Sequence, residues 1–495
     1  MLMKSKNSIT KNIFYKLLLN IFNIVVPLII GPYAATVIGP KYLGRIYYSE
    51  AIYVYFLIIA TFGIYNYGLR EISRIRDDKE KLSKLFTSLF LIGVISNTLS
   101  LIIYILFVFV NYSSQPQFPV LLIYGFTLFS NIFYVEWLCE ATESFNFITI
   151  KTIILRIFYI VLLLLLVKKS SDYLIYAALN SLLVFFNYVF SFVYIKKNIK
   201  FNFNNLQLRK HIKPLLIILI MSNASILYNQ LDKLLLGSYV SEISVGYYNI
   251  GQILSSIVNT MLLSIILVTI PRLSNVIASN GDEAYETLLN KVTNTYLAFL
   301  FPAAIGMMVL SKEIILLLYK STYIESVNVL RIFSVFIILS GLDFLLVNSI
   351  FYVKKQEKLA MIIVASFGLV NLLLKIILIY SNHLNHVTTI ASTTTVELAL
   401  VIVEYIVIKK FLKVNLNLIS PEKVRYLLTS LLFIPLSFMV KLLIHNIILI
   451  ILITMSLCTL VYSLILLFLR DEFLLEVLEK FKVKLIINKL KQYKK

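Results

Sequence analysis

Charged residues are scarce in this chain. Asp, Glu, Lys and Arg make up 14% of its 495 residues, against roughly 25% in an average globular protein. Hydrophobic residues account for 59%, more than the roughly 45–50% of a soluble domain. Since a protein core cannot bury so much apolar surface, the composition excludes soluble globular, disordered and collagen-like proteins. It predicts a polytopic membrane protein.

Cysteine and histidine are scarce as well. Cys139 and Cys458 fall in apolar segments far apart in the sequence, so neither a disulfide nor a metal site is expected from them. His383 and His386 share a short loop that has no carboxylate nearby, and we predict no zinc site there. Nucleotide-binding and hydrolase motifs are missing, and no predicted loop could hold a nucleotide-binding fold. We therefore expect no ATPase, no catalytic residues, no metal and no cofactor.

Apolar runs of about 20 residues, each long enough to cross a hydrocarbon core of about 30 Å, recur along the chain. They predict an all-α integral membrane protein with about 14 transmembrane helices. The first of these runs directly follows the N-terminal residues, which show no small-residue cleavage site, and no cleavable signal peptide is predicted. The predicted spans are 12–38, 45–67, 84–110, 119–139, 147–167, 172–195, 214–238, 245–270, 289–311, 328–351, 357–380, 388–408, 424–442 and 446–469.

Basic residues are unevenly divided between the two predicted sides of the membrane. With the N-terminus inside, most of the 46 lysines and arginines fall in inner segments. This asymmetry follows the positive-inside rule, so the net charge of +21 indicates membrane topology rather than nucleic-acid binding. We expect a multi-pass protein with both termini in the cytoplasm. The predicted outer segments hold only Lys41, Arg45, Lys168, Lys169, Lys312, Lys320 and Lys441.

One short motif occurs twice. GPKYLGRIYY (39–48) follows the first span, and GSYVSEISVGYY (237–248) follows the seventh, so that each opens the next span. Chance recurrence in a tyrosine-rich chain is one explanation. Gene duplication is the other, and transporters commonly place their substrate at the interface of such repeats.

A duplication predicts two pseudo-symmetric six-helix lobes followed by two additional transmembrane helices. The C-terminal tail would then be basic and cytoplasmic, either an amphipathic helix on the anionic inner leaflet or a solvated segment. The predicted parts are an N-terminal lobe (1–195), a basic cytoplasmic linker (196–213), a C-terminal lobe (214–410), the two further helices (411–469) and the tail (470–495).

Four stretches in the first half of the chain carry a family resemblance. They are IIGPYAATVIGPKYLG (29–44), YGLREISRIRDD (67–78), EWLCEATESFNFI (136–148) and LYNQLDKLLLGSYVSEISVGYYNIGQIL (227–254). In this order and spacing they resemble the polysaccharide exporters of the MOP flippase superfamily, which include Wzx-type O-antigen flippases and their teichoic-acid and lipid II relatives. Many such proteins have a basic residue where this chain has Thr36, so no phosphate contact is carried over to that position.

The resemblance implies a non-enzymatic flippase of a bacterial plasma (inner) membrane. Its substrate would be an undecaprenyl-diphosphate-linked oligosaccharide, the precursor of a surface polysaccharide, capsule, O-antigen or teichoic acid, moved from the inner to the outer leaflet by alternating access. The implied partners are this lipid-linked oligosaccharide and the bilayer, with a polysaccharide polymerase and glycosyltransferases as further candidates and no nucleic acid.

Two other functions stay open. A multidrug or cation exporter of the same superfamily would favour a net acidic cavity. A polysaccharide polymerase would be expected to carry a large outer loop with Arg or His, which this sequence does not have.

Ionisable residues within spans are the first candidates for a substrate site, because an ionised group at the bilayer centre costs about 2.5–3.5 kcal/mol. A diphosphate needs cationic donors, and the arginine fork engages two oxygens at once. The candidate diphosphate ligands are Arg45, Arg156 and Arg272, with Lys16 behind them. Arg45 and Lys16 have a simpler alternative as residues that snorkel at span ends. If the repeats face one cavity, Arg272 lies at its cytoplasmic mouth and Arg45 at its outer mouth.

Sugars are bound through hydrogen bonds to their hydroxyl groups, which amides supply, and through aromatic rings on their apolar faces. The candidate amides are Asn223, Asn229, Gln230 and Gln252. The candidate rings are Tyr33, Tyr228, Tyr247 and Tyr248, although many of the 32 tyrosines are expected to lie in interfacial belts.

Acidic residues within spans are candidates for ion coupling. These are Asp232, Asp343 and Glu397. For Asp232 an ion pair with Lys233 is the alternative.

Overall fold

The computed structural model describes residues 9–204 and 206–480. These residues form helices joined by short loops, with no β-strand among them, which confirms the predicted all-α class. The chain divides into two compact units, Met1–Gly246 and Tyr247–Lys495. This division says nothing of internal symmetry, so the predicted lobes and linker stay a prediction.

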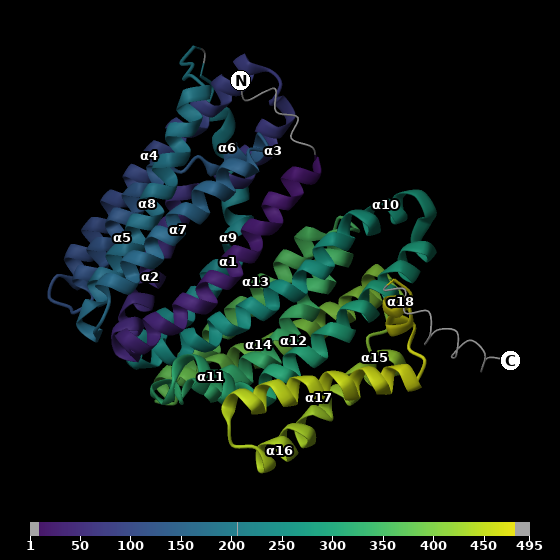
Figure 1. Cartoon of the computed structure of the whole chain (residues 1–495). Helices are drawn as coiled ribbons and strands as arrows, with labels where there is room; N and C mark the ends of the chain where they lie inside the picture. Colours follow the sequence, from purple (N-terminus) through teal and green to yellow (C-terminus); the bar gives the residue numbers. More distant parts are fainter. Residues whose placement is uncertain (1–8, 205, 481–495) are drawn as a thin grey trace. The chain divides into compact units, whose positions relative to one another are not determined.

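The described residues of unit 1 form nine α-helices and the first residues of a tenth, coloured purple to teal in Figure 1. Its longest helices, α4 and α9, are each long enough to cross a bilayer. The helices are α1 (Ile9–Ile38), α2 (Pro40–Thr61), α3 (Ile64–Ile75), α4 (Lys79–Tyr112), α5 (Phe118–Ser130), α6 (Glu136–Ala141), α7 (Phe145–Leu166), α8 (Tyr173–Asn198) and α9 (Leu208–Tyr239).

Unit 2 contains most of α10 and the helices that follow it. In α10 the backbone leaves helical geometry at Gly281 (φ 81°, ψ −175°), so this element consists of two consecutive helices. Two π-helical segments, Val347–Phe351 and Ile408–Leu412, follow α12 and α14 directly. The helices are α10 (Glu242–Val309), α11 (Ser311–Tyr319), α12 (Ser326–Leu346), α13 (Glu357–Tyr380), α14 (His386–Val407), α15 (Pro421–Leu431), α16 (Phe433–Leu443), α17 (Ile447–Phe468) and α18 (Glu472–Lys480).

Each of the fourteen predicted spans coincides with a helix or with consecutive helices. Within the described residues, eleven segments are long and apolar enough to cross a membrane, and one of them is the 68-residue α10. The predicted eighth and ninth spans both fall in α10, on either side of Gly281. The C-terminal tail begins with α18, and its residues 481–495 lie outside the described part of the chain.

Two predicted spans of unit 1 are broken rather than continuous. The second breaks at Phe62 and Gly63, both with positive φ, between α2 and α3. The fourth breaks between α5 and α6, where the 3-10 turn Asn131–Phe133 intervenes. Inside a membrane such breaks are tolerated only where other groups satisfy the freed backbone carbonyls.

Neighbouring side chains supply those hydrogen bonds. The Ala60 carbonyl, at the end of α2, accepts from Ser96 Oγ (2.7 Å) and from Asn97 Nδ2 (3.1 Å) on α4. Asn131 Nδ2 in turn donates to Asn97 Oδ1 (2.8 Å). This chain of amides connects the break in the second span to the break in the fourth. Buried polar groups are thus used here to hold an irregular backbone in place.

Each unit has its own apolar core. In unit 1 it surrounds Phe86 and Trp137, both fully buried. In unit 2 it surrounds Tyr285 and Phe351, and the Tyr285 hydroxyl donates to the Ser349 carbonyl (2.7 Å). The many exposed leucines and isoleucines elsewhere are expected for helices whose outer faces meet lipid.

Candidate substrate-binding site

In unit 1, helices α1 and α7 pack side by side and carry three of the predicted substrate residues between them. Lys16 Nζ lies 5.3 Å from the centre of the Phe145 ring, at the start of both helices. Eleven residues further along α7, the Arg156 guanidinium lies 6.0 Å from the centre of the Phe22 ring on α1. Near the far end, the Tyr33 hydroxyl donates to the Val167 carbonyl (2.8 Å). The two helices are therefore parallel, and we call this row of residues the α1–α7 seam.

Arg156 is the central cation of the α1–α7 seam. It occupies the middle of α7, a helix that is otherwise rich in leucine and isoleucine. Its Nη1 atom is buried and has no hydrogen-bond partner among the described residues. A guanidinium kept inside an apolar span without an acidic partner is costly. This nitrogen is therefore available to an anion that comes from outside the protein, such as a phosphate oxygen.

Lys16 stands nearer the predicted cytoplasmic end of the same seam, and its side chain is exposed. An exposed ammonium at a span end and a buried guanidinium at mid-span form two cationic positions along one helix pair. Such a series suits an anionic headgroup that moves along the helices.

Arg45, by contrast, is already engaged within unit 1. Its Nε and Nη2 donate to the two carboxylate oxygens of Glu242 (2.8 and 3.0 Å), and its Nη1 donates to the Tyr173 hydroxyl (3.2 Å). Gln117 Nε2 adds a further hydrogen bond to Glu242 Oε1 (2.8 Å). The fork that would bind a diphosphate is occupied, so the predicted role of Arg45 requires this pair to open.

The Arg45–Glu242 pair gives a stability prediction. Both side chains are about nine-tenths buried, and removing one partner of a buried pair leaves an uncompensated charge that costs about 3–5 kcal/mol. We expect Arg45→Ala to lower the thermal unfolding midpoint of the purified protein clearly. The double variant Arg45→Gln, Glu242→Gln should unfold closer to the wild type. Equal midpoints for Arg45→Ala and the wild type would contradict this structural role.

The other predicted ligands are distributed over both units. Gln230 Oε1 is buried without a hydrogen-bond partner in the described part of unit 1. In unit 2, Gln252 is half-buried and Arg272 is exposed. Tyr247 packs edge-on against the rings of Tyr323 and His386, and the buried Tyr248 packs against Phe333. The side chains of Asn223, Tyr228 and Asn229 lie outside the described residues.

The acidic candidates fall into two places. Asp232 is buried in unit 1 next to Lys233, whose Nζ lies 6.0 Å from the centre of the Tyr47 ring. Asp343 and Glu397 lie in unit 2, on the packed helices α12 and α14. The structure adds Glu404 to them, a fully buried residue that the sequence reasoning missed. Its spacing of seven from Glu397, which places both on one helix face, was the available signal.

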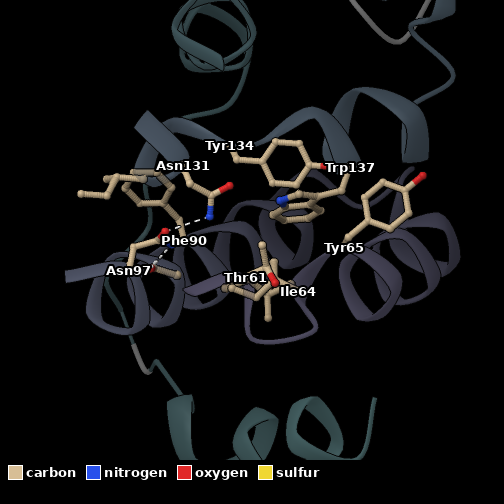
Figure 2. Close-up of a pocket in the computed structure, with 11 residues that line it drawn as sticks. Thr61, Ile64, Tyr65, Phe90, Asn97, Asn131, Tyr134 and Trp137 are labelled. Atoms are coloured by element: carbon tan, nitrogen blue, oxygen red, sulfur yellow. Dashed lines mark hydrogen bonds between the residues drawn. The ribbon is translucent and has the colours of Figure 1, made fainter. Parts of the chain in front are cut away.

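A small pocket in unit 1 was also not foreseen. It lies at the two helix breaks, where Figure 2 shows the rings of Tyr65, Tyr134 and Trp137 on one side and the bonded amides of Asn97 and Asn131 on the other. Rings and amides together are chemically suited to sugars. Here, however, Asn97 Nδ2 and Asn131 Nδ2 already donate within the protein. The pocket therefore belongs to the support of the broken helices.

Comparison with a solved structure defines the class of this fold. The chain superposes on the structure described as "Lipid II flippase MurJ, inward closed conformation" with a TM-score of 0.71, covering 93% of this chain and 99% of that one at 18% identity. The two chains therefore share one all-α fold.

The family follows from the sequence. The model of the polysaccharide biosynthesis protein family matches residues 9–277, more than half of the chain, and the chain belongs to this family. A curated relative is the putative O-antigen transporter of Escherichia coli (strain K12), 23% identical over 172 residues. That alignment spans 34% of this chain and 40% of the relative.

Proposed function

We propose that this protein is a flippase for an undecaprenyl-diphosphate-linked oligosaccharide, a precursor of surface polysaccharide, capsule, O-antigen or teichoic acid. It acts in a bacterial plasma membrane with both termini in the cytoplasm. Two lobes, 1–195 and 214–410, alternate in exposing the substrate to either side. Glycosyltransferases supply the substrate on the inner leaflet, and a polysaccharide polymerase uses it on the outer leaflet.

The observation that carries this proposal is Arg156 at mid-span of α7. Its Nη1 is buried and has no hydrogen-bond partner among the described residues, which favours an anionic ligand inside the membrane region. A diphosphate linked to a lipid supplies two such phosphoryl groups at bilayer depth. Lys16 and Tyr33 lie on the same helix pair and extend the polar row toward both ends.

A cation or multidrug exporter is the second candidate. It is favoured by the buried Glu397 and Glu404 and the half-buried Asp343 in unit 2, none of which forms a salt bridge within the described residues. The family membership favours the flippase.

Complementation separates the two functions. The chain is expressed in a panel of strains that each lack their own polysaccharide flippase, with protein levels matched by immunoblot. If the chain is a flippase, surface polymer should return in at least one strain. Absence of polymer from every strain, together with increased resistance to cationic drugs, would favour the exporter instead.

A further inference from the structure

Three acidic side chains gather on two packed helices of unit 2. Asp343 lies on α12, and Glu397 and Glu404 lie on α14, which packs closely against it. The carboxyl groups of Asp343 and Glu404 lie within hydrogen-bonding reach of each other. Glu397 stands seven residues earlier on the same face of α14, about 10 Å along the axis. We call these three residues the carboxyl cluster.

No donor in the described residues satisfies the centre of this cluster. Glu404 is 0% exposed, and neither of its carboxyl oxygens accepts a hydrogen bond. Asp343 Oδ1 is also buried and also has no hydrogen-bond partner among the described residues. Two ionised carboxylates side by side in an apolar interior repel each other and have lost their hydration, so the pair is stable only when it holds a proton.

Two basic side chains on the neighbouring elements contact residues outside the carboxyl cluster. On α13, the buried Lys375 contacts the Thr389 carbonyl (3.3 Å) and Thr393 Oγ1 (2.9 Å), at least one helical turn from Glu397. In the segment after α14, Lys409 Nζ lies 5.9 Å from the centre of the Tyr405 ring.

Three further polar groups lie on these elements. Asn371 on α13 is fully buried, and Lys410, in the π-helical segment after α14, is exposed. Arg331 lies in the N-terminal half of α12, twelve residues before Asp343. Its guanidinium donates hydrogen bonds to Ser311 Oγ and Asn328 Oδ1. Within the described residues these basic groups make their known contacts with other residues, and we assign the neutralisation of the carboxyl cluster to protons.

The backbone changes at the same level on both helices. Four residues after Asp343, α12 becomes π-helical at Val347, and four residues after Glu404, α14 becomes π-helical at Ile408. Such segments are rare and concentrate at functional sites. Their paired occurrence beside the two carboxyl groups is independent evidence that this end of the helix pair has a role beyond packing.

A metal ion is not the expected ligand. Within the described residues no group of three or more His, Cys, Asp or Glu side chains is arranged to hold one. A proton shared by two carboxyl groups needs only that pair.

We propose that the carboxyl cluster is a proton-binding site, in which Asp343 and Glu404 share one proton and Glu397 is a second acceptor nearer the middle of the span. Loading and release of this proton change the charge buried between α12 and α14. Resting on the flippase function proposed above, we further infer that this change of charge couples transport to the proton gradient.

Infrared spectroscopy of the full-length protein in lipid nanodiscs tests proton binding without any transport. Stepping the pH in light and heavy water should reveal a protonated-carboxyl band that shifts on deuteration. The band should weaken in Glu404→Gln and in Asp343→Asn. It should persist in the control Asp282→Asn, whose side chain is 69% exposed. An unchanged band in Glu404→Gln and Asp343→Asn, or no such band in the wild type, would overturn the site.

Coupling is tested in liposomes that carry a fluorescent polyprenyl-diphosphate sugar and an imposed pH difference. With one coupled proton, the ratio of labelled lipid in the two leaflets should change by up to about tenfold per pH unit in the wild type. It should change by less than about twofold in Glu404→Gln. An equal response in Glu404→Gln and the wild type would overturn coupling through this site. Absence of all transport would refute the flippase function, while the infrared result would still decide proton binding.

Discussion

Replacing Arg156 by glutamine is expected to slow flipping of a diphosphate-linked lipid by about 10- to 100-fold, because hydrogen bonds to charged groups contribute about 1.5–3 kcal/mol each. Arg156→Lys should fall between the variant and the wild type, since it keeps the charge and loses the fork. The measurement is the initial rate of leaflet exchange in liposomes containing equal amounts of each protein.

A control and a stability readout separate binding from folding. Arg74→Gln removes the same charge from a side chain that is 69% exposed, and it should flip at the wild-type rate. Because Arg156 Nη1 has no hydrogen-bond partner in the part of the chain that the structure describes, Arg156→Gln should unfold at the wild-type temperature or above it. A wild-type flipping rate for Arg156→Gln would exclude the α1–α7 seam as the headgroup path.

Gly44→Val is expected to abolish folding. A Cβ atom at Gly44 would lie 1.7 Å from the Glu242 carbonyl oxygen and 2.9 Å from the Gly246 amide nitrogen. Both are backbone atoms that cannot rotate away, so the cost should exceed the about 1–3 kcal/mol of ordinary overpacking. We expect the variant to lose its monodisperse peak in size-exclusion chromatography of solubilised membranes, and Gly44→Ala to be strongly depleted.

Gly368 offers the matched control for this substitution. It lies within helix α13, and a Cβ atom there would meet nothing within 4 Å. Gly368→Ala should therefore behave like the wild type, or be more stable by up to about 1 kcal/mol from helix propensity. A normal yield of Gly44→Val would show that the start of α2 and the start of α10 do not pack as described.

The helical spans could be predicted from sequence because lipid requires long apolar runs with internally bonded backbones. The breaks at Phe62–Gly63 and Asn131–Phe133 could not, since the apolar pattern continues through them. They depend on partners such as Asn97, which lies on another helix.

The candidate site was predicted in part. The energetic cost of an ionised group in the middle of a span identified Arg156 in the sequence as a cation that needs an anionic partner. Its position beside the Phe22 ring became known only from the structure. The ion pair of Arg45 was missed because Glu242 is 197 residues away in sequence. Only the fold could bring these two residues together.

Membrane potential tests the central claim most directly. Outward movement of a headgroup of about two negative charges is favourable by roughly 4–5 kcal/mol at a membrane potential of about 100 mV, inside negative, and needs no ATP. In liposomes holding the purified protein, a fluorescent undecaprenyl-diphosphate oligosaccharide and an imposed potassium diffusion potential, outward movement should proceed without ATP and accelerate when the inside is negative. Movement that is absent, or indifferent to both potential and ion gradients, would contradict the account.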